Sequence, residues 1–262
     1  MPEFRHIEYC MGTAFQYWGR SDLDPSEIEE AIRKSCDVLN HADEVFSLYK
    51  PNSPLSRLAR GETSMTQLAD EVNFVWEQCE YWEKETNGWF SAMTPENTFD
   101  PSGLVKALAT EQAGMILEEN GVIDFAINAG GDIRLSKYIS AGLPKRIAIS
   151  KPVSISERSG ALTVLDLNNT DYFAVATSGT AERGNHIWNP KQKGFVESDL
   201  LQVTVIAQDI ITADVFATAA FAAGKEAGKL LSDNQHRLEA LVIDLEGNTF
   251  ATAGFQNLVS PS

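Results

Sequence analysis

Residues 209–224 form the segment that most restricts how this chain can fold. The segment is rich in Ala, Val, Ile and Phe, and its pattern indicates an apolar helix. Asp214 and Thr218 stand four residues apart, which places both oxygen-bearing side chains on one face of that helix. A carboxylate beside a hydroxyl in an apolar wall suits a hard cation such as Mg²⁺. The alternative is an ordinary helix start, with Thr212 as the cap and Asp214 in the first turn.

The charge of the chain limits its partners. The 262 residues carry a net charge of −16, which repels phosphate backbones, so we expect no nucleic-acid partner. An anionic ligand would have to be held by helix N-termini, backbone N–H groups or a bound cation. The content of hydrophobic residues, 43%, and of charged residues, 22%, is typical of a folded domain.

The cysteines and the N-terminal sequence predict the compartment. Cys10, Cys36 and Cys79 form no Cys-x-x-Cys pair, and their odd number favours reduced, buried thiols. The first residues lack the pattern of a signal peptide, and no apolar run is long enough to cross a bilayer. We therefore expect a cytoplasmic protein without membrane insertion.

Periodicity along the chain predicts an α+β fold. Residues 4–18 alternate like a strand, and the later half of the chain holds most of the other strand patterns. The predicted helices cover residues 24–47, 68–84, 104–119, 209–224 and 226–232. The predicted strands cover residues 124–128, 145–150, 160–166, 171–177 and 201–207, with a final hairpin of 240–244 and 249–252. No linker or repeat divides the chain, so we expect one domain over residues 1–262.

Two glycine-containing loops follow predicted strands. Residues 128–132 (NAGGD) include Gly130 and Gly131, whose lack of a side chain lets backbone N–H groups approach a ligand. The alternative is an ordinary turn between strands. Residues 177–186 (TSGTAERGNH) combine hydroxyls, Arg183 and His186, and a histidine there could act as a general base. A packing or surface histidine is the alternative.

Three further segments carry groups that could contact a cofactor. Tyr49, in a turn after a helix, could stack on a planar ring, or Ser56 there could merely cap a short turn. Residues 100–106 (DPSGLVK) lead into a helix, where Ser102 could cap it and Asp100 and Lys106 could contact a ligand. Residues 11–13 (MGT) could line a pocket or form a strand bulge.

The order of these blocks resembles the ApbE family of FAD:protein FMN transferases. The matching blocks are MGT (11–13), SLYKPNSPLSRL (47–58), DPSGLVK (100–106), INAGGD (127–132), ATSGTAER (176–183) with HIWNP (186–190), and VTVI (203–206) with 213–218. Together they span nearly the whole chain.

The resemblance implies an ApbE-like, T-fold-related domain of two lobes, with mixed sheets and packed helices. It also implies transfer of FMN from FAD to a Thr or Ser hydroxyl of an acceptor flavoprotein that carries a flavinylation motif, with release of AMP. The implied Mg²⁺ ligands are the Gly103 carbonyl, Asp214 and Thr218, and the implied catalytic residues are His186 and Lys106. The implied FAD-binding residues are Met11, Tyr49, Phe90, Ser91, Asp100, Lys106, Gly130, Gly131, Thr177 and Ser178.

Three positions depart from the family pattern. Ala107 replaces a glycine, Ser91 replaces an aspartate, and Asn189 replaces the aspartate of the His-Ile-x-Asp-Pro block. These departures favour an FAD-binding protein that has lost turnover, whereas Asp214, Thr218 and His186 favour an active enzyme. Hydrolysis of FAD to FMN and AMP is a further alternative at the same site.

Overall fold

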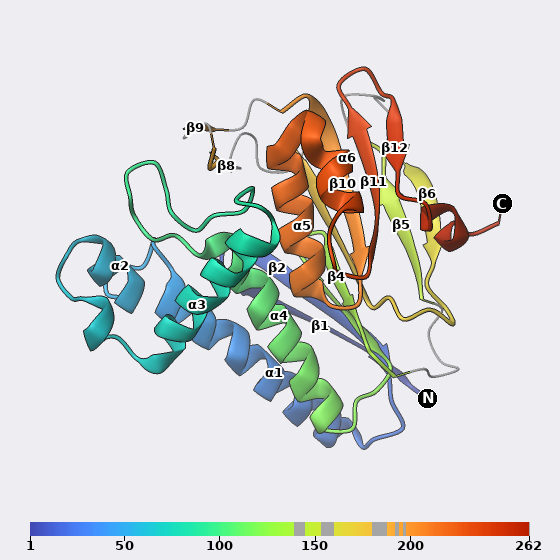
Figure 1. Cartoon of the computed structure of the whole chain (residues 1–262). Coiled ribbons are helices and arrows are strands. Elements are labelled where there is room, and N and C mark those ends of the chain that lie inside the picture. Colours follow the sequence, from blue (N-terminus) through green and yellow to red (C-terminus); the bar gives the residue numbers. More distant parts are fainter. Residues whose placement is uncertain (139–144, 153–159, 180–187, 192–193, 196–197, 262) are drawn as a thin grey trace.

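A computed structural model describes residues 1–138, 145–152, 160–179, 188–191, 194–195 and 198–261 (Figure 1). His186, the histidine that the resemblance implies to be catalytic, lies outside these residues. Among the described residues, no helix has both the length and the apolar character needed to cross a membrane.

The largest element is a sheet of eight strands. Its spatial order is β1 (Glu3–Cys10), β2 (Thr13–Arg20), β3 (Phe125–Ala129), β4 (Asp132–Leu135), β7 (Ala174–Gly179), β10 (Leu200–Ala207), β11 (Leu238–Asp244) and β12 (Thr249–Ala251). Every ladder between described strands is antiparallel. The expected α+β class is confirmed, with antiparallel sheets where mixed ones are expected.

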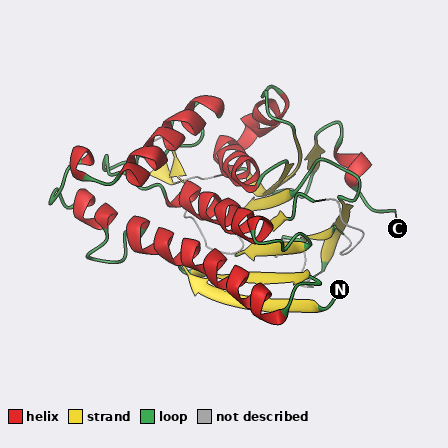
Figure 2. Ribbon diagram, turned by 90° about the horizontal axis from the view of Figure 1, so that it is seen from below, coloured by secondary structure: helices red, strands yellow, loops and turns green. Residues whose placement is uncertain are grey.

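Helices cover one face of this sheet (Figure 2). The helices on the sheet are α1 (Pro25–Phe46), α4 (Ser102–Glu119), α5 (Ile210–Ala223) and the short α6 (Ala227–Ser232). The long α3 (Asp70–Glu85) and the short α2 (Pro54–Ala59) lie further out, beyond α1 and α4 (Figure 1). The main core forms between these helices and the sheet, and α5 lies deepest, with Val215, Phe216 and Ala217 fully buried. The apolar character of α5 therefore matches its position.

The other face of the sheet is covered by a hairpin of β5 (Arg146–Ser150) and β6 (Ala161–Asp166). Ile147 and Ile149 of β5 pack with Val175 and Ile206 in a second, smaller core. Alternation along β3 separates the two cores, because Phe125 and Ile127 face the helices whereas Ala126 faces the hairpin. A further described pair, β8 (Trp188–Asn189) and β9 (Gly194–Phe195), forms a separate two-stranded sheet.

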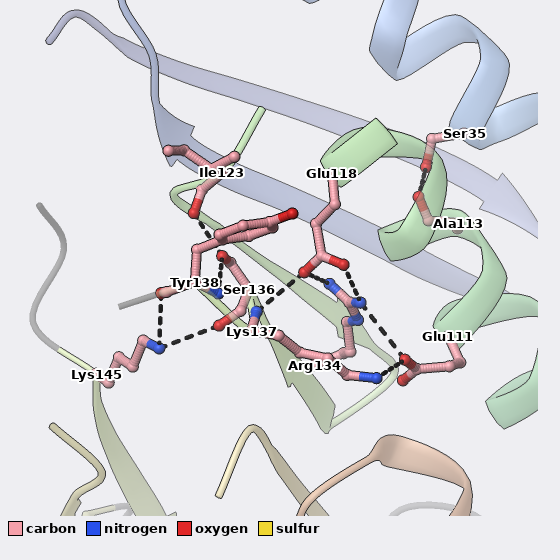
Figure 3. Close-up of polar contacts among 10 residues, drawn as sticks. All are labelled: Ser35, Glu111, Ala113, Glu118, Ile123, Arg134, Ser136, Lys137, Tyr138 and Lys145. Carbon is pink, nitrogen blue, oxygen red and sulfur yellow. Dashed lines mark hydrogen bonds and ion pairs between the residues drawn. The ribbon is translucent and has the colours of Figure 1, made fainter. Parts of the chain in front are cut away.

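A buried arginine joins α4 to the sheet (Figure 3). Arg134 on β4 is 1% exposed, and its guanidinium lies 3.0 Å from Glu118 and 3.4 Å from Glu111, both on α4. Burial opposes ionisation of Glu111, but Arg134 and Lys137 outweigh it and lower the pKa of that carboxyl. Gly114 leaves room for the guanidinium, since a Cβ there would lie 2.4 Å from it.

Most predicted elements are confirmed within a few residues of their bounds. The single strand over residues 4–18 is wrong, because Met11 and Gly12 adopt positive φ angles of 48° and 68° and turn the chain into a β1–β2 hairpin. The sequence pattern does not indicate β4, which is only four residues long, or α2.

Three caps that the sequence suggested, two of them as alternatives to a functional role, are wrong. Asp209 caps α5, accepting the Thr212 N–H at 2.8 Å, so Asp214 lies in the second turn and the helix-start alternative fails. Ser53 rather than Ser56 caps α2. Asp100 accepts the Ser102 N–H at 3.0 Å in front of α4, so Ser102 is the first helical residue and not the cap. In α5 and α2 the chain uses the acceptor that stands just before the first turn, whereas the cap position of α4 is Pro101.

Candidate functional site

A cavity of about 1090 Å³ opens where the end of α1, the start of α4 and the middle of α5 meet the sheet and the β5 strand. Thirteen residues proposed from the sequence lie in its wall, although they come from positions spread between residues 11 and 218. They are Met11, Tyr49, Phe90, Ser91, Asp100, Gly103, Lys106, Gly130, Gly131, Thr177, Ser178, Asp214 and Thr218. The structure thus brings together every proposed site residue that it describes.

Lys106 lies at the centre of the polar groups. Its ammonium forms an ion pair with Asp132 and lies 3.5 Å from the Asp214 carboxylate. Lys106 stands on α4, Asp132 begins β4 and Asp214 is on α5, so this cluster joins two helices and the sheet. The position of Lys106 follows from its place in the second turn of α4, on the same helix as Gly103.

Asp214 and Thr218 occupy the wall formed by α5. The Asp214 side chain is buried, at 7% exposure for the residue, among alanines and phenylalanines of that helix. The Thr218 hydroxyl lies 3.3 Å from the Ser178 hydroxyl of β7. Gly103 lines the same cavity from the first turn of α4. A carboxylate, a hydroxyl and a backbone carbonyl are hard oxygen donors, so this set fits Mg²⁺ by its chemistry.

Two tight turns bring backbone to the cavity. The β1–β2 turn holds Met11, and the β3–β4 turn holds Gly130 and Gly131 at φ angles of 64° and 105°. The Asn128 side chain accepts the Gly131 N–H at 2.7 Å and fixes this second turn. Positive φ angles of this kind are readily adopted by glycine, which explains the paired glycines of the NAGGD block.

Tyr49 differs from the other wall residues in its exposure. It is 97% exposed, although it lies in the wall of the cavity. Its backbone N–H is bound by Ser47, while Ser53 and Ser56 both donate to the Ser47 carbonyl. The backbone of this turn is therefore held firmly while the aromatic ring is free to contact a ligand.

The charge of the cavity wall is mainly negative. Among the described residues, five acids and three lysines line it: Asp43, Glu96, Asp100, Asp132 and Asp214, with Lys50, Lys106 and Lys151. Lys50 is already 2.7 Å from Asp43 and 2.6 Å from Glu44. An anionic ligand would therefore need an additional cation in this cavity.

Comparison with known proteins identifies the family. The model of the ApbE family matches residues 91–242. The chain belongs to the ApbE family. Curated relatives named FAD:protein FMN transferase include proteins of Vibrio cholerae, 29% identical over 176 residues, and of Escherichia coli K12, 26% identical over 166 residues. These alignments cover 63% and 60% of this chain but 51% and 46% of the relatives, so the chain matches about half of their length.

ApbE structures share the whole fold. The flavin transferase ApbE from Vibrio cholerae superposes with a TM-score of 0.80 at 20% identity, covering 98% of this chain and 99% of that one. An ApbE protein from Thermotoga maritima gives 0.82 at 20% identity, covering 99% and 100%. At this identity the likeness establishes the ApbE fold.

The three departures from the ApbE pattern have different surroundings. Ala107 is 1% exposed and does not line the cavity, so its methyl group packs in the protein interior. Ser91 lines the cavity, and its hydroxyl accepts the Met93 N–H at 3.1 Å. Asn189 is buried, donates to the Ala222 carbonyl at 3.2 Å and accepts the Lys191 N–H at 3.0 Å. Asn189 therefore ties β8 to the end of α5.

Several wall residues are missed by sequence reasoning. Asp132 is the last residue of the NAGGD block, and the two glycines before it could have indicated that it lies in the site. Trp89 lines the cavity and carries the Lys191 ammonium 3.8 Å from its ring centre. Ile147 and Ile149 line it from β5, and their alternation indicates a strand but gives no sign of a ligand. Contacts between segments that are distant in the sequence bring these residues to the cavity wall.

Proposed function

We propose that this ApbE-family chain transfers FMN from FAD to a Thr or Ser hydroxyl of an acceptor flavoprotein in an Mg²⁺-dependent reaction that releases AMP. The observation that carries the proposal is that the thirteen described residues to which the ApbE resemblance gives a role all line one cavity, although they are far apart in the sequence. The names of the curated relatives point to the same activity. FAD is the donor substrate, and the acceptor is a second protein.

The acidic wall supports the requirement for a metal. The pyrophosphate of FAD is anionic, and among the described residues five acids and three lysines line the cavity. Mg²⁺ held by the Gly103 carbonyl, Asp214 and Thr218 would neutralise the phosphoryl oxygens. Lys106 would add a second positive charge from α4. Gly130 and Gly131, which have no side chains, would let the backbone of the β3–β4 turn approach the FAD closely.

The reaction itself exchanges one phosphorus–oxygen bond for another. The acceptor hydroxyl oxygen bonds to the phosphorus of the FMN half, and the bond from that phosphorus to the AMP phosphate oxygen breaks. The hydroxyl proton must be removed, which we assign to His186 as the general base. Tyr49 and Met11 would contact the rings of FAD, with Phe90, Ser91, Asp100, Thr177 and Ser178 lining the remaining cavity.

The test is incubation of the purified chain with FAD, MgCl₂ and an acceptor domain bearing the motif Asp-x-x-(Ser/Thr)-Gly-Ala-(Ser/Thr), followed by intact mass measurement. We expect a gain of one FMN on the acceptor, and no gain when EDTA is present. The matched control is an acceptor domain in which both Ser/Thr positions of this motif are replaced by Ala. A gain that persists with EDTA would contradict the metal requirement.

The other outcomes distinguish the alternative functions. Appearance of free FMN and AMP without a modified acceptor would identify an FAD hydrolase. FAD that stays bound, with neither product, would identify a flavin-binding relative without turnover.

We also propose that the protein acts in a reducing compartment such as the cytoplasm. All three cysteines are free and buried in the structure, which is compatible with that environment.

A further inference from the structure

The carboxylate of Asp132 is placed where α4, β4 and β7 meet. The residue is 4% exposed, and its two oxygens face different partners. One oxygen pairs with the Lys106 ammonium, and the other accepts the Thr177 N–H at 2.9 Å. Asp132 therefore contacts one residue from each of two segments, 100–106 and 177–178, that the resemblance links to FAD.

The bond to Thr177 continues a ladder that the backbone leaves incomplete. Described pairing between β4 and β7 joins Ile133 to Val175 and Arg134 to Ala174. Thr177 lies two positions beyond Val175 on β7, where no backbone pair with β4 is described, and the side chain of Asp132 accepts its N–H. The carboxylate is thereby fixed in orientation, and so is the cation that it binds.

Lys106 has a second carboxylate within reach. Its ammonium is 3.5 Å from Asp214, which is also the carboxylate assigned above to Mg²⁺. If Lys106 lost Asp132, Coulomb attraction would favour its movement toward Asp214. The Lys106 ammonium would then compete with Mg²⁺ for the Asp214 carboxylate, and it would lie further from the pyrophosphate of a bound FAD.

We propose that Asp132 is a positioning residue that holds Lys106 between the Asp214 carboxylate and the FAD pyrophosphate. This inference rests on the proposed function, because it assigns Asp132 a role in binding the same FAD molecule. Asp132 acts through Lys106 and through the Thr177 backbone, and it takes no part in bond making.

A double-mutant cycle tests this inference. FAD affinity is measured with MgCl₂ by flavin fluorescence for the parent, Asp132→Asn, Lys106→Met and the double variant. Asparagine can still accept the Thr177 N–H, so the substitution mainly removes the charge. We expect Asp132→Asn to weaken FAD binding at least about tenfold in the parent and to have less than about a twofold effect in Lys106→Met.

Glu118→Gln supplies the matched control. Glu118 also pairs with a cation across the α4–β4 contact, but its partner is Arg134, and neither residue lines the cavity (Figure 3). We expect Glu118→Gln to change FAD affinity less than about twofold in both backgrounds. Urea unfolding of every variant reports its stability, and Asp132→Ala, which also removes the charge, replaces Asp132→Asn in the cycle if the latter does not fold.

Each remaining result has a definite meaning. An equal effect of Asp132→Asn in both backgrounds, or no effect in either, would overturn the inference while leaving the proposed function intact. A parent protein that does not bind FAD would overturn the proposed function and the inference with it.

Discussion

Asp214 combines burial with a charge on a helix whose other buried residues are nearly all apolar. If its carboxylate holds Mg²⁺, Asp214→Asn should lower Mg²⁺-dependent transfer at least about 100-fold, because the amide is a weaker ligand and carries no charge. The fold should persist, since the two side chains have nearly the same shape. Transfer rates measured over a range of MgCl₂ concentrations give the comparison.

Asp209→Ala, at the cap of the same helix, is the control for Asp214→Asn. Asp209 caps the helix that carries Asp214 but does not line the cavity. Its loss should lower the free energy of unfolding by about 1 kcal/mol and leave the Mg²⁺ dependence unchanged. An Asp214→Asn variant with the parent's Mg²⁺ response would remove Asp214 from the metal site.

At the scale of elements, the contact between α4 and β4 depends on Gly114. Replacing a helical glycine by alanine usually stabilises an exposed helix by about 1 kcal/mol. Here the new Cβ would lie 2.4 Å from the Arg134 guanidinium, so Gly114→Ala should instead destabilise the protein by about 1–3 kcal/mol. Urea unfolding measures the difference.

Gly228→Ala in α6 is the comparison for that variant. An added Cβ at Gly228 would lie 3.5 Å from the Phe250 ring, an ordinary contact. Its free energy of unfolding should stay within about 0.5 kcal/mol of the parent value. Equal stability of Gly114→Ala and Gly228→Ala would show that Arg134 can move away without cost.

The elements also show what the sequence could predict. Helices α1, α3, α4 and α5 have long apolar patterns, and their predicted bounds agree closely with the structure. The β1–β2 hairpin was hidden because Met11 adopts the positive φ that is more typical of glycine or asparagine. Pairing of β4 with β7, and hence the role of Asp132, depends on contacts between residues more than forty positions apart, which no local pattern contains. The candidate site was predicted from ordered motifs, and the cavity that joins them came from the fold.

At the scale of the whole molecule, three buried thiols should make the free energy of unfolding fall at alkaline pH. Burial raises the pKa of Cys10, Cys36 and Cys79 to about 12 each, from an ordinary value of 9.0. The unfolded chain therefore releases thiol protons at lower pH than the native protein does. The thiol contribution to stability is fully present below pH 9 and is lost as the pH rises toward 12.

Two measurements check this expectation. Urea unfolding at a series of pH values above 9 should show a falling free energy of unfolding, and Cys36→Ala should reduce that slope. At pH 8 the native protein should react slowly with a thiol reagent such as DTNB, and the denatured chain should react at all three cysteines. Rapid reaction of a native thiol would contradict the burial of that residue.

The dispersed origin of the cavity wall has a thermodynamic consequence. Its described residues run from Met11 to Thr218 and come from helices, strands and turns that meet only in the complete fold. A ligand bound there has no comparable site in the unfolded chain, so it stabilises the native state by about 2.7 kcal/mol at a free concentration one hundred times its Kd. If that ligand is a flavin nucleotide, its supply would influence how long the folded protein survives proteolysis, as well as how often its site is filled.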